Sequence, residues 1–68
     1  MLDDKKREII RALAEYNMNV AETARQLHYH RNNVAYHVER VYKKTGLNPT
    51  NFYGLVKLLE MVKEEEDG

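Results

Sequence analysis

The chain has 68 residues and a mass of 8.1 kDa, which suffices for one small domain and leaves no room for a second catalytic or sensory module. It has no cysteine, which excludes disulfides, thiolate metal sites and a cysteine nucleophile and favours a reducing compartment. Hydrophobic residues make up 43% and charged residues 32%, as in soluble globular domains, and no apolar run approaches the ~20 residues that span a bilayer. With three glycines and one proline, little material remains for hairpins or phosphate-binding loops, so an all-α fold is expected.

The net charge of zero conceals a separation of charge along the chain. Residues 20–48 carry five basic and two acidic residues, a net charge of +3. Residues 60–68 carry one basic and five acidic residues, a net charge of −4. A nucleic-acid-binding surface would therefore lie in the middle of the chain, ahead of an acidic tail.

Hydrophobic periodicity and capping signals divide the chain into four helices. Asp3 or Asp4 can cap the first helix, which breaks at residues 17–19. Its apolar side comprises Ile9, Ile10, Ala12, Leu13 and Tyr16. Asn19 with Glu22 forms an asparagine version of the capping box before a second helix over residues 20–27. A third helix follows the polar connection at residues 28–30 and ends at Gly46.

The fourth helix has its start signal at Asn48-Pro49-Thr50, with the proline in its first turn. Its apolar side chains cover an arc of about 160°, wider than the ~100° that one packing contact needs. They are Phe52, Leu55, Val56, Leu58, Leu59 and Val62. Glutamates at its C-terminal end oppose the helix macrodipole, so residues 64–68 should fray. The predicted fold is one domain over residues 1–68, with a homeodomain-like three-helix core and a C-terminal helix.

The second and third helices have the spacing of a helix-turn-helix at about residues 20–45. Small Ala24 would allow the two helices to cross closely, with Leu27, Val34 and Val38 filling the crossing. The same corner occurs in helical proteins that do not bind DNA, so this geometry alone leaves nucleic-acid binding open.

The outward face of the third helix is polar and basic, as a groove-reading surface requires. Asparagine can pair bidentately with adenine and arginine with guanine, while tyrosine can reach a phosphate or a thymine methyl group. The candidates for base or near-base contacts are His30, Arg31, Asn32, Asn33, Tyr36 and Arg40. The candidates for phosphate contacts are Thr23, Arg25, Lys43 and Lys44. The alternative for all of them is a solvated polar helix face.

A resemblance to a known family rests on residues 19–47, NVAETARQLHYHRNNVAYHVERVYKKTGL. This stretch resembles the C-terminal helix-turn-helix domain of the purine-catabolism and carbohydrate-diacid regulator family of bacterial transcription factors. The matching residues are Val20, Thr23, Ala24, Leu27, His30, Arg31, Asn32, Tyr36, Val38, Glu39, Arg40, Val41, Thr45, Gly46 and Leu47. The resemblance implies sequence-specific binding of duplex DNA by the third helix in a transcriptional regulator, normally downstream of a sensory region.

The chain departs from this family pattern on the third helix. The family usually has threonine at the position of Asn33, and arginine at the positions of Ala35 and His37. The loss of two cations predicts weaker and less salt-dependent DNA binding. No sensory region accompanies the domain, so both a piece of a longer regulator and a free-standing small protein stay open.

The histidines and the fourth helix carry further expectations. His28, His30 and His37 could in principle bind zinc, but two lie in the turn and no carboxylate is placed to orient them. We expect His30 to cap the third helix and His37 to pack at the core boundary, which would make DNA binding or dimerisation pH-sensitive at about pH 6 to 7. Without serine or cysteine, and with its carboxylates on solvated faces, the chain is not expected to be an enzyme or to need a cofactor.

The wide apolar arc of the fourth helix has two interpretations. It can close the small core against the first helix, or form a two-fold interface that spaces two recognition helices one DNA turn apart, about 34 Å. We expect a homodimer, because so small a core gains stability from shared burial. The interface candidates are Phe52, Leu55, Leu58, Leu59 and Val62.

The sequence therefore predicts a cytoplasmic, nucleoid-associated protein that binds double-stranded DNA, with no membrane partner and no evident small-molecule site. The rival hypothesis is a protein-interaction module that uses the fourth helix and has lost its affinity for DNA. RNA binding has less support, because a helical chain lacks the sheet of stacking aromatics that RNA-binding folds use.

Overall fold

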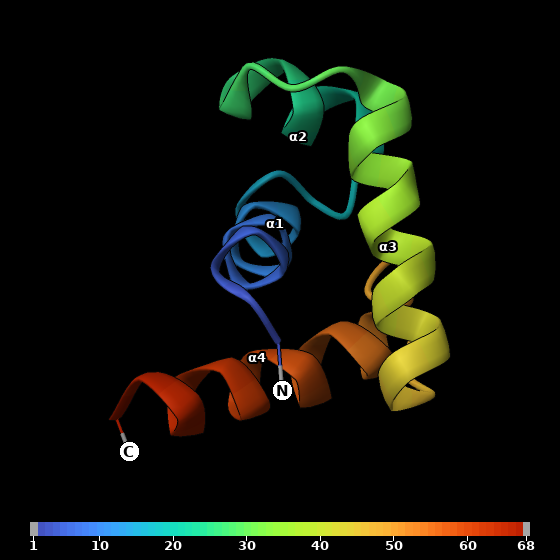
Figure 1. The fold of residues 1–68 in the computed structure, drawn as a ribbon. Coiled ribbons are helices and arrows are strands. Elements are labelled where there is room, and N and C mark those ends of the chain that lie inside the picture. Colours follow the sequence, from blue (N-terminus) through green and yellow to red (C-terminus); the bar gives the residue numbers. More distant parts are fainter. Residues whose placement is uncertain (1, 68) are drawn as a thin grey trace.

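The computed structural model describes residues 2–67 and contains four helices. They are α1 (Asp4–Glu15), α2 (Val20–Leu27), α3 (Arg31–Thr45) and α4 (Phe52–Asp67). Helix α1 packs against each of the other three, and α2 also packs against α3 (Figure 1). The all-α, four-helix prediction is confirmed. None of the helices in the described part of the chain is both long and apolar enough to span a bilayer.

The ends of α1 and α3 follow local signals that the sequence displays. The Oδ1 atom of Asp3 accepts the backbone N–H of Lys6 at 2.9 Å, so Asp3 is the N-cap of α1. Gly46 ends α3 in the left-handed conformation, with φ of 77°, and its N–H donates to the Tyr42 carbonyl at 2.8 Å. Both boundaries were predicted, because a cap is a contact between near neighbours in the chain.

The start of α2 is capped as predicted, although only half of the capping box forms. Asn19 Oδ1 accepts the Glu22 N–H at 2.9 Å. The Glu22 carboxylate instead accepts from Gln26 at 2.7 Å and pairs with Arg25 at 2.9 Å. The Asn19 N–H donates to the Tyr16 carbonyl at 3.1 Å, so it does not need the glutamate. The reciprocal bond of a full capping box is replaced by contacts along α2 itself.

Helix α4 begins later than predicted. Pro49 was expected in its first turn, but it is buried in the turn that precedes the helix. The cap is Asn51, whose Oδ1 accepts the N–H groups of Tyr53 at 3.1 Å and Gly54 at 3.3 Å. The first N–H groups of a helix need a hydrogen-bond acceptor outside the helix. The Asn51 side chain supplies one, whereas a proline side chain cannot, so the helix starts at Phe52.

The core draws buried apolar side chains from all four helices and from Leu2, which lies two residues before the start of α1. Its members are Leu2, Ile9, Ile10, Leu13, Ala24, Val34, Val41, Leu55, Leu58 and Val62. This corrects the expected dimer interface, since Leu55, Leu58 and Val62 are at most 5% exposed and fill the core of their own chain. Leu59 also packs against that core, whereas Phe52 is 72% exposed.

The acidic end of the chain is helical, which corrects the predicted fraying of residues 64–68 as far as the structure describes them. Glu65 Oε1 lies 3.2 Å from Arg7 Nη1, and Glu66 lies 3.9 Å from Arg7 Nε and also pairs with Arg11. The last turn of α4 has no basic residue of its own, and its glutamates interact unfavourably with the negative end of the helix macrodipole. The two arginines on α1 supply the missing cations and so offset this repulsion. The last residue of the predicted tail lies outside the described residues.

Candidate nucleic-acid interface

The turn between α2 and α3 is closed by backbone hydrogen bonds. His28 adopts the left-handed conformation, with φ of 62°, and its N–H donates to the Arg25 carbonyl at 3.3 Å. The next N–H, that of Tyr29, donates to the Ala24 carbonyl at 2.8 Å. These bonds satisfy the last carbonyls of α2 and turn the chain sharply, which sets the angle at which α3 leaves.

Tyr29 fixes this turn to α1. Its hydroxyl donates to Glu8 Oε1 at 2.6 Å, and the Lys5 ammonium lies 4.6 Å from the centre of its ring. The hydrogen bond to Glu8 raises the pKa of the Tyr29 phenol, so the phenol keeps its proton and remains a donor. Sequence reasoning missed this contact, although an aromatic residue between two turn histidines was the available signal.

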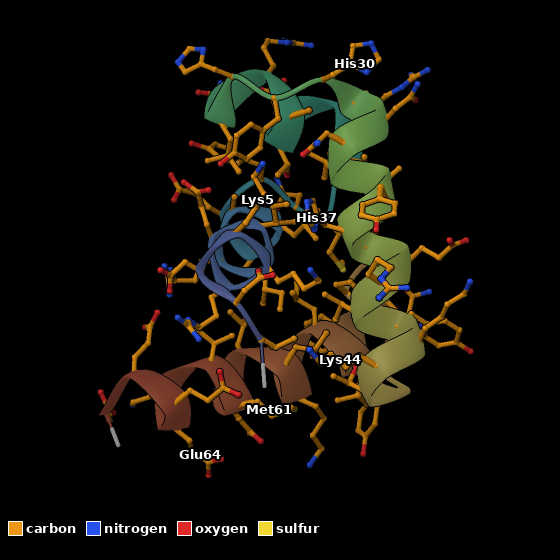
Figure 2. All side chains as sticks on the ribbon, in the orientation of Figure 1. Lys5, His30, His37, Lys44, Met61 and Glu64 are labelled. Carbon is orange, nitrogen blue, oxygen red and sulfur yellow. The ribbon has the colours of Figure 1, made fainter. Side chains whose placement is uncertain are left out.

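The first turn of α3 is capped by His30, as predicted. Its Nδ1 accepts the Asn32 N–H at 3.1 Å, while the rest of the ring is exposed at the end of the helix (Figure 2). Because Nδ1 accepts, the ring proton of the neutral imidazole lies on Nε2, which is directed away from the cap.

Buried residues determine which side of α3 faces outward. Val34 and Val41 are at most 1% exposed, and Ala24 of α2, at 3%, lies in the same cluster. Val38 packs against this cluster as well. The predicted crossing is confirmed, and the opposite side of α3 is left to solvent.

That opposite side forms a polar surface, which we call the α3 polar face. It consists of the exposed residues Asn32, Asn33, Tyr36, Arg40 and Lys43. The Tyr36 side chain is 55% exposed, and its ring meets the edge of the His37 ring with centroids 5.3 Å apart. Lys43 pairs with Glu39 at 3.7 Å, but both side chains are about two-thirds exposed, so the pair is weak.

Two other phosphate candidates lie on α2 and differ in accessibility. Arg25 is exposed, although it pairs with Glu22 at 2.9 Å. The Thr23 side chain is fully buried, and its Oγ1 has no hydrogen-bond partner within the described residues. It lies beside Ala24 on the inner side of the helix, so it cannot reach a phosphate. The interpretation of Thr23 as a phosphate contact was therefore wrong.

The three histidines lie apart. His28 and His30 are exposed near the turn, whereas His37 is half-buried between α1 and α3 (Figure 2). Burial lowers the pKa of His37, as do the nearby ammonium groups of Lys6 and Lys5, with Asp3 opposing them. Its Nδ1 is buried without a hydrogen-bond partner in residues 2–67. No group of three metal-ligating side chains converges in that part of the chain.

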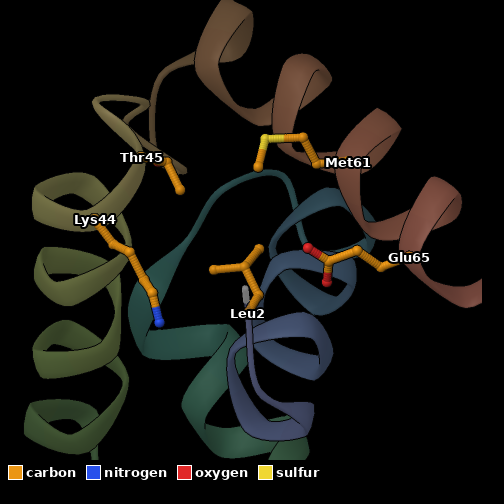
Figure 3. A pocket seen from close by; sticks show the side chains of 5 residues that line it. All are labelled: Leu2, Lys44, Thr45, Met61 and Glu65. Carbon is orange, nitrogen blue, oxygen red and sulfur yellow. The ribbon is translucent and has the colours of Figure 1, made fainter.

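Two hollows flank the C-terminal half of α3. The first, which we call the cationic pocket, has a volume of about 330 Å³. It is lined by Lys6, Arg40, Lys43 and Lys44. The second, of about 340 Å³, is lined by Leu2, Lys44, Thr45, Met61 and Glu65 (Figure 3). The second hollow mixes apolar groups with one cation and one carboxylate, so only the first has a uniform charge.

Comparison with known families agrees with this geometry. A family model described as the PucR C-terminal helix-turn-helix domain matches residues 7–62, which include most of α1 and α4 as well as the central corner. The chain belongs to this family. No curated protein and no solved structure matches it significantly.

The departures from the family pattern can now be placed on this PucR-type domain. Asn33 and Ala35 are exposed on α3, so an arginine at position 35 would extend into solvent. His37 instead faces the lysines of α1. An arginine at position 37 would lie beside the ammonium groups of Lys5 and Lys6. Histidine, which can be neutral when buried, avoids this repulsion.

Proposed function

We propose that this domain binds double-stranded DNA sequence-specifically with α3 in the major groove, acting in the cytoplasm as a transcriptional regulator or as the DNA-binding domain of one. The observation that carries the proposal is the α3 polar face, presented outward by the buried Val34 and Val41 in a chain of this helix-turn-helix family. A helix is the element that fits the major groove, and this one offers amide and guanidinium groups along its exposed side.

Within this proposal, the first turns of α3 read bases and its last turns hold the backbone. The base or near-base set is His30, Arg31, Asn32, Asn33, Tyr36 and Arg40, all of them exposed. The phosphate set is Arg25, Lys43 and Lys44, without the buried Thr23. Lysines late in a recognition helix suit the flanking phosphates, because an ammonium acts as a point charge without a required plane.

The rival hypothesis, a protein-interaction module built on α4, has lost most of its surface. Three of the apolar residues on which it rested, Leu55, Leu58 and Val62, are buried against the rest of the chain. The exposed polar and basic groups of α3 support DNA binding instead.

A homodimer belongs to the same proposal. Phe52, Tyr53 and Val56 are 72%, 66% and 37% exposed at the start of α4, and burial of these side chains against a second copy would stabilise so small a domain. Analytical ultracentrifugation of the wild type and of Phe52→Ala tests this, with a weaker dimer expected for the variant. A monomer mass that does not change with concentration would overturn it.

The DNA-binding proposal is tested by fluorescence anisotropy of a labelled mixed-sequence duplex at ~50 and ~200 mM salt. We expect micromolar binding that weakens steeply with salt, and a loss of about tenfold or more in Arg31→Ala/Arg40→Ala. The matched control is Lys57→Ala/Lys63→Ala, which removes two exposed cations from α4 instead. Absence of binding at low salt, or equal losses in both double variants, would contradict the proposal.

A further inference from the structure

The cationic pocket lies where the first turn of α1 meets the second half of α3. Among residues 2–67, its lining consists of one lysine of α1 and three cations of α3, with no acidic residue: Lys6, Arg40, Lys43 and Lys44. Its volume of about 330 Å³ is at the lower end of the range of small-ligand pockets, roughly 300–1,000 Å³. Asp3 pairs with Lys6 and Glu39 pairs with Lys43, but four cations against two carboxylates leave the surroundings of the hollow positive, which favours an anion.

Lys6 is held in this position by the cap of α1. Its side chain is 13% exposed, and its ammonium lies 3.1 Å from Asp3 Oδ2. The other oxygen of the same carboxylate accepts the Lys6 N–H at 2.9 Å, so the cap fixes both the backbone and the side chain. An ammonium that is mostly removed from water gains from a further negative partner.

The α3 side of the pocket is shared with the α3 polar face. Arg40 and Lys43 belong to both. Within the described residues, the Lys43 ammonium is engaged by the long, exposed contact with Glu39 at 3.7 Å, which a phosphate can replace at little loss. Lys44 projects from α3 toward the segment that leads into α1 (Figure 3).

We propose that the cationic pocket is a phosphate-binding site to which α1 contributes Lys6. Arginine can bind a phosphate with two parallel N–H bonds, and lysines add point charges around it. Since two lining residues also lie on the α3 polar face, the nearest source of the phosphate is the backbone of DNA bound there. This source rests on the proposed function, whereas a free phosphate group is the other source of the same chemistry.

The first arm of the test measures DNA affinity against salt for the wild type, Lys6→Gln and Lys63→Gln. Each phosphate contact contributes about 0.9 to the slope of log affinity on log salt. The ratio of the wild-type DNA affinity to that of Lys6→Gln should therefore shrink by about threefold between ~50 and ~200 mM salt. This change should be the same for duplexes of unrelated sequence. Lys63→Gln removes the same charge from an exposed site on α4 and should match the wild type. Lys6→Arg keeps the cation and should restore the slope, which a purely structural role of Lys6 does not predict.

The second arm uses inorganic phosphate alone and records amide chemical shifts by NMR. Saturable shifts at Arg40 and Lys43 that vanish in Lys6→Gln would support the site with free phosphate as ligand. A changed salt slope without such shifts would support it with DNA as the source. If the wild type binds DNA but neither readout depends on Lys6, the inference is overturned and the proposed function stands. If the wild type does not bind DNA, the proposed function fails and the phosphate titration alone decides the site.

Discussion

Gly54 allows the first turn of α4 to lie directly against the backbone of the preceding turn. A Cβ atom added at this buried position would stand 2.3 Å from the Asn48 carbonyl oxygen and 2.8 Å from the Asn48 nitrogen. Both are backbone atoms, so no side-chain rotation relieves the overlap. Gly54→Ala must therefore move α4 away from Asn48 or distort the turn.

Two effects of opposite sign decide the size of this perturbation. Alanine is favoured over glycine inside a helix by about 1 kcal/mol. Overpacking a well-filled site is unfavourable by about 1–3 kcal/mol, and rigid backbone atoms place Gly54 toward the upper end. The net expectation is a loss of about 1–2 kcal/mol in the free energy of unfolding. For a domain of this size, that lowers Tm by roughly 4–16 °C.

Thermal and urea denaturation followed by circular dichroism measure this change. The matched control is Gly46→Asn, because Gly46 has φ of +77° and nothing within 4 Å of an added Cβ, and asparagine tolerates that backbone conformation. We expect the control to stay close to the wild type. An increase in the Tm of Gly54→Ala would refute the reasoning, since helix propensity alone predicts that increase.

Three further predictions concern the helix-turn-helix. Thr23→Val should leave DNA affinity unchanged and the free energy of unfolding equal or higher, because the buried hydroxyl has no hydrogen-bond partner within the described residues. A loss of DNA affinity without a loss of stability would restore the phosphate role of Thr23. Tyr29→Phe should lower Tm, because it removes the hydrogen bond to Glu8 that fixes the turn to α1; an unchanged melting curve would show that the bond is unimportant. Burial and the lysines of α1 hold the pKa of His37 below its usual 6.5, so the unfolded chain binds this proton more readily and stability should fall as pH drops below about 6.5. Urea denaturation at pH ~7.5 and ~5.5 should show this fall, and His37→Gln should reduce it.

Local interactions made much of the fold predictable from the sequence. Asp3 and Asn19 mark the starts of α1 and α2, and Gly46 marks the end of α3. Each does so through a hydrogen bond to a residue three or four positions away, so the local sequence is enough to predict it. The crossing of α2 and α3 was predictable because Ala24 and Leu27 on α2, and Val34, Val38 and Val41 on α3, are spaced to lie on one side of their helices. The exposed candidates on α3 follow from the same period.

Contacts between distant segments could not be predicted in this way. Periodicity shows that α4 has a wide apolar arc, but not that Leu58 is covered by its own chain rather than by a second copy. Arg7 and Glu65 are 58 positions apart in the chain, yet they form a pair. This pair stabilises the helical end of α4, which the unfavourable contact between its glutamates and the helix macrodipole alone predicts to fray. The meeting of Lys6 with Arg40 in the cationic pocket is another product of the packing of α1 on α3.

Ala35 and His37 are the two positions at which the family resemblance implies arginine, and they should respond differently when a cation is introduced. Ala35 is exposed, so Ala35→Arg should steepen the salt dependence of DNA binding by about one phosphate contact and leave the melting temperature unchanged. His37→Arg should also add a cation, but it places a permanent charge at a half-buried site beside Lys5 and Lys6 and should lower the melting temperature. Anisotropy and thermal denaturation of both variants separate the two effects. Equal stability of the two variants would show that the α1 lysines do not oppose charge at position 37, and would remove the physical reason given for the histidine.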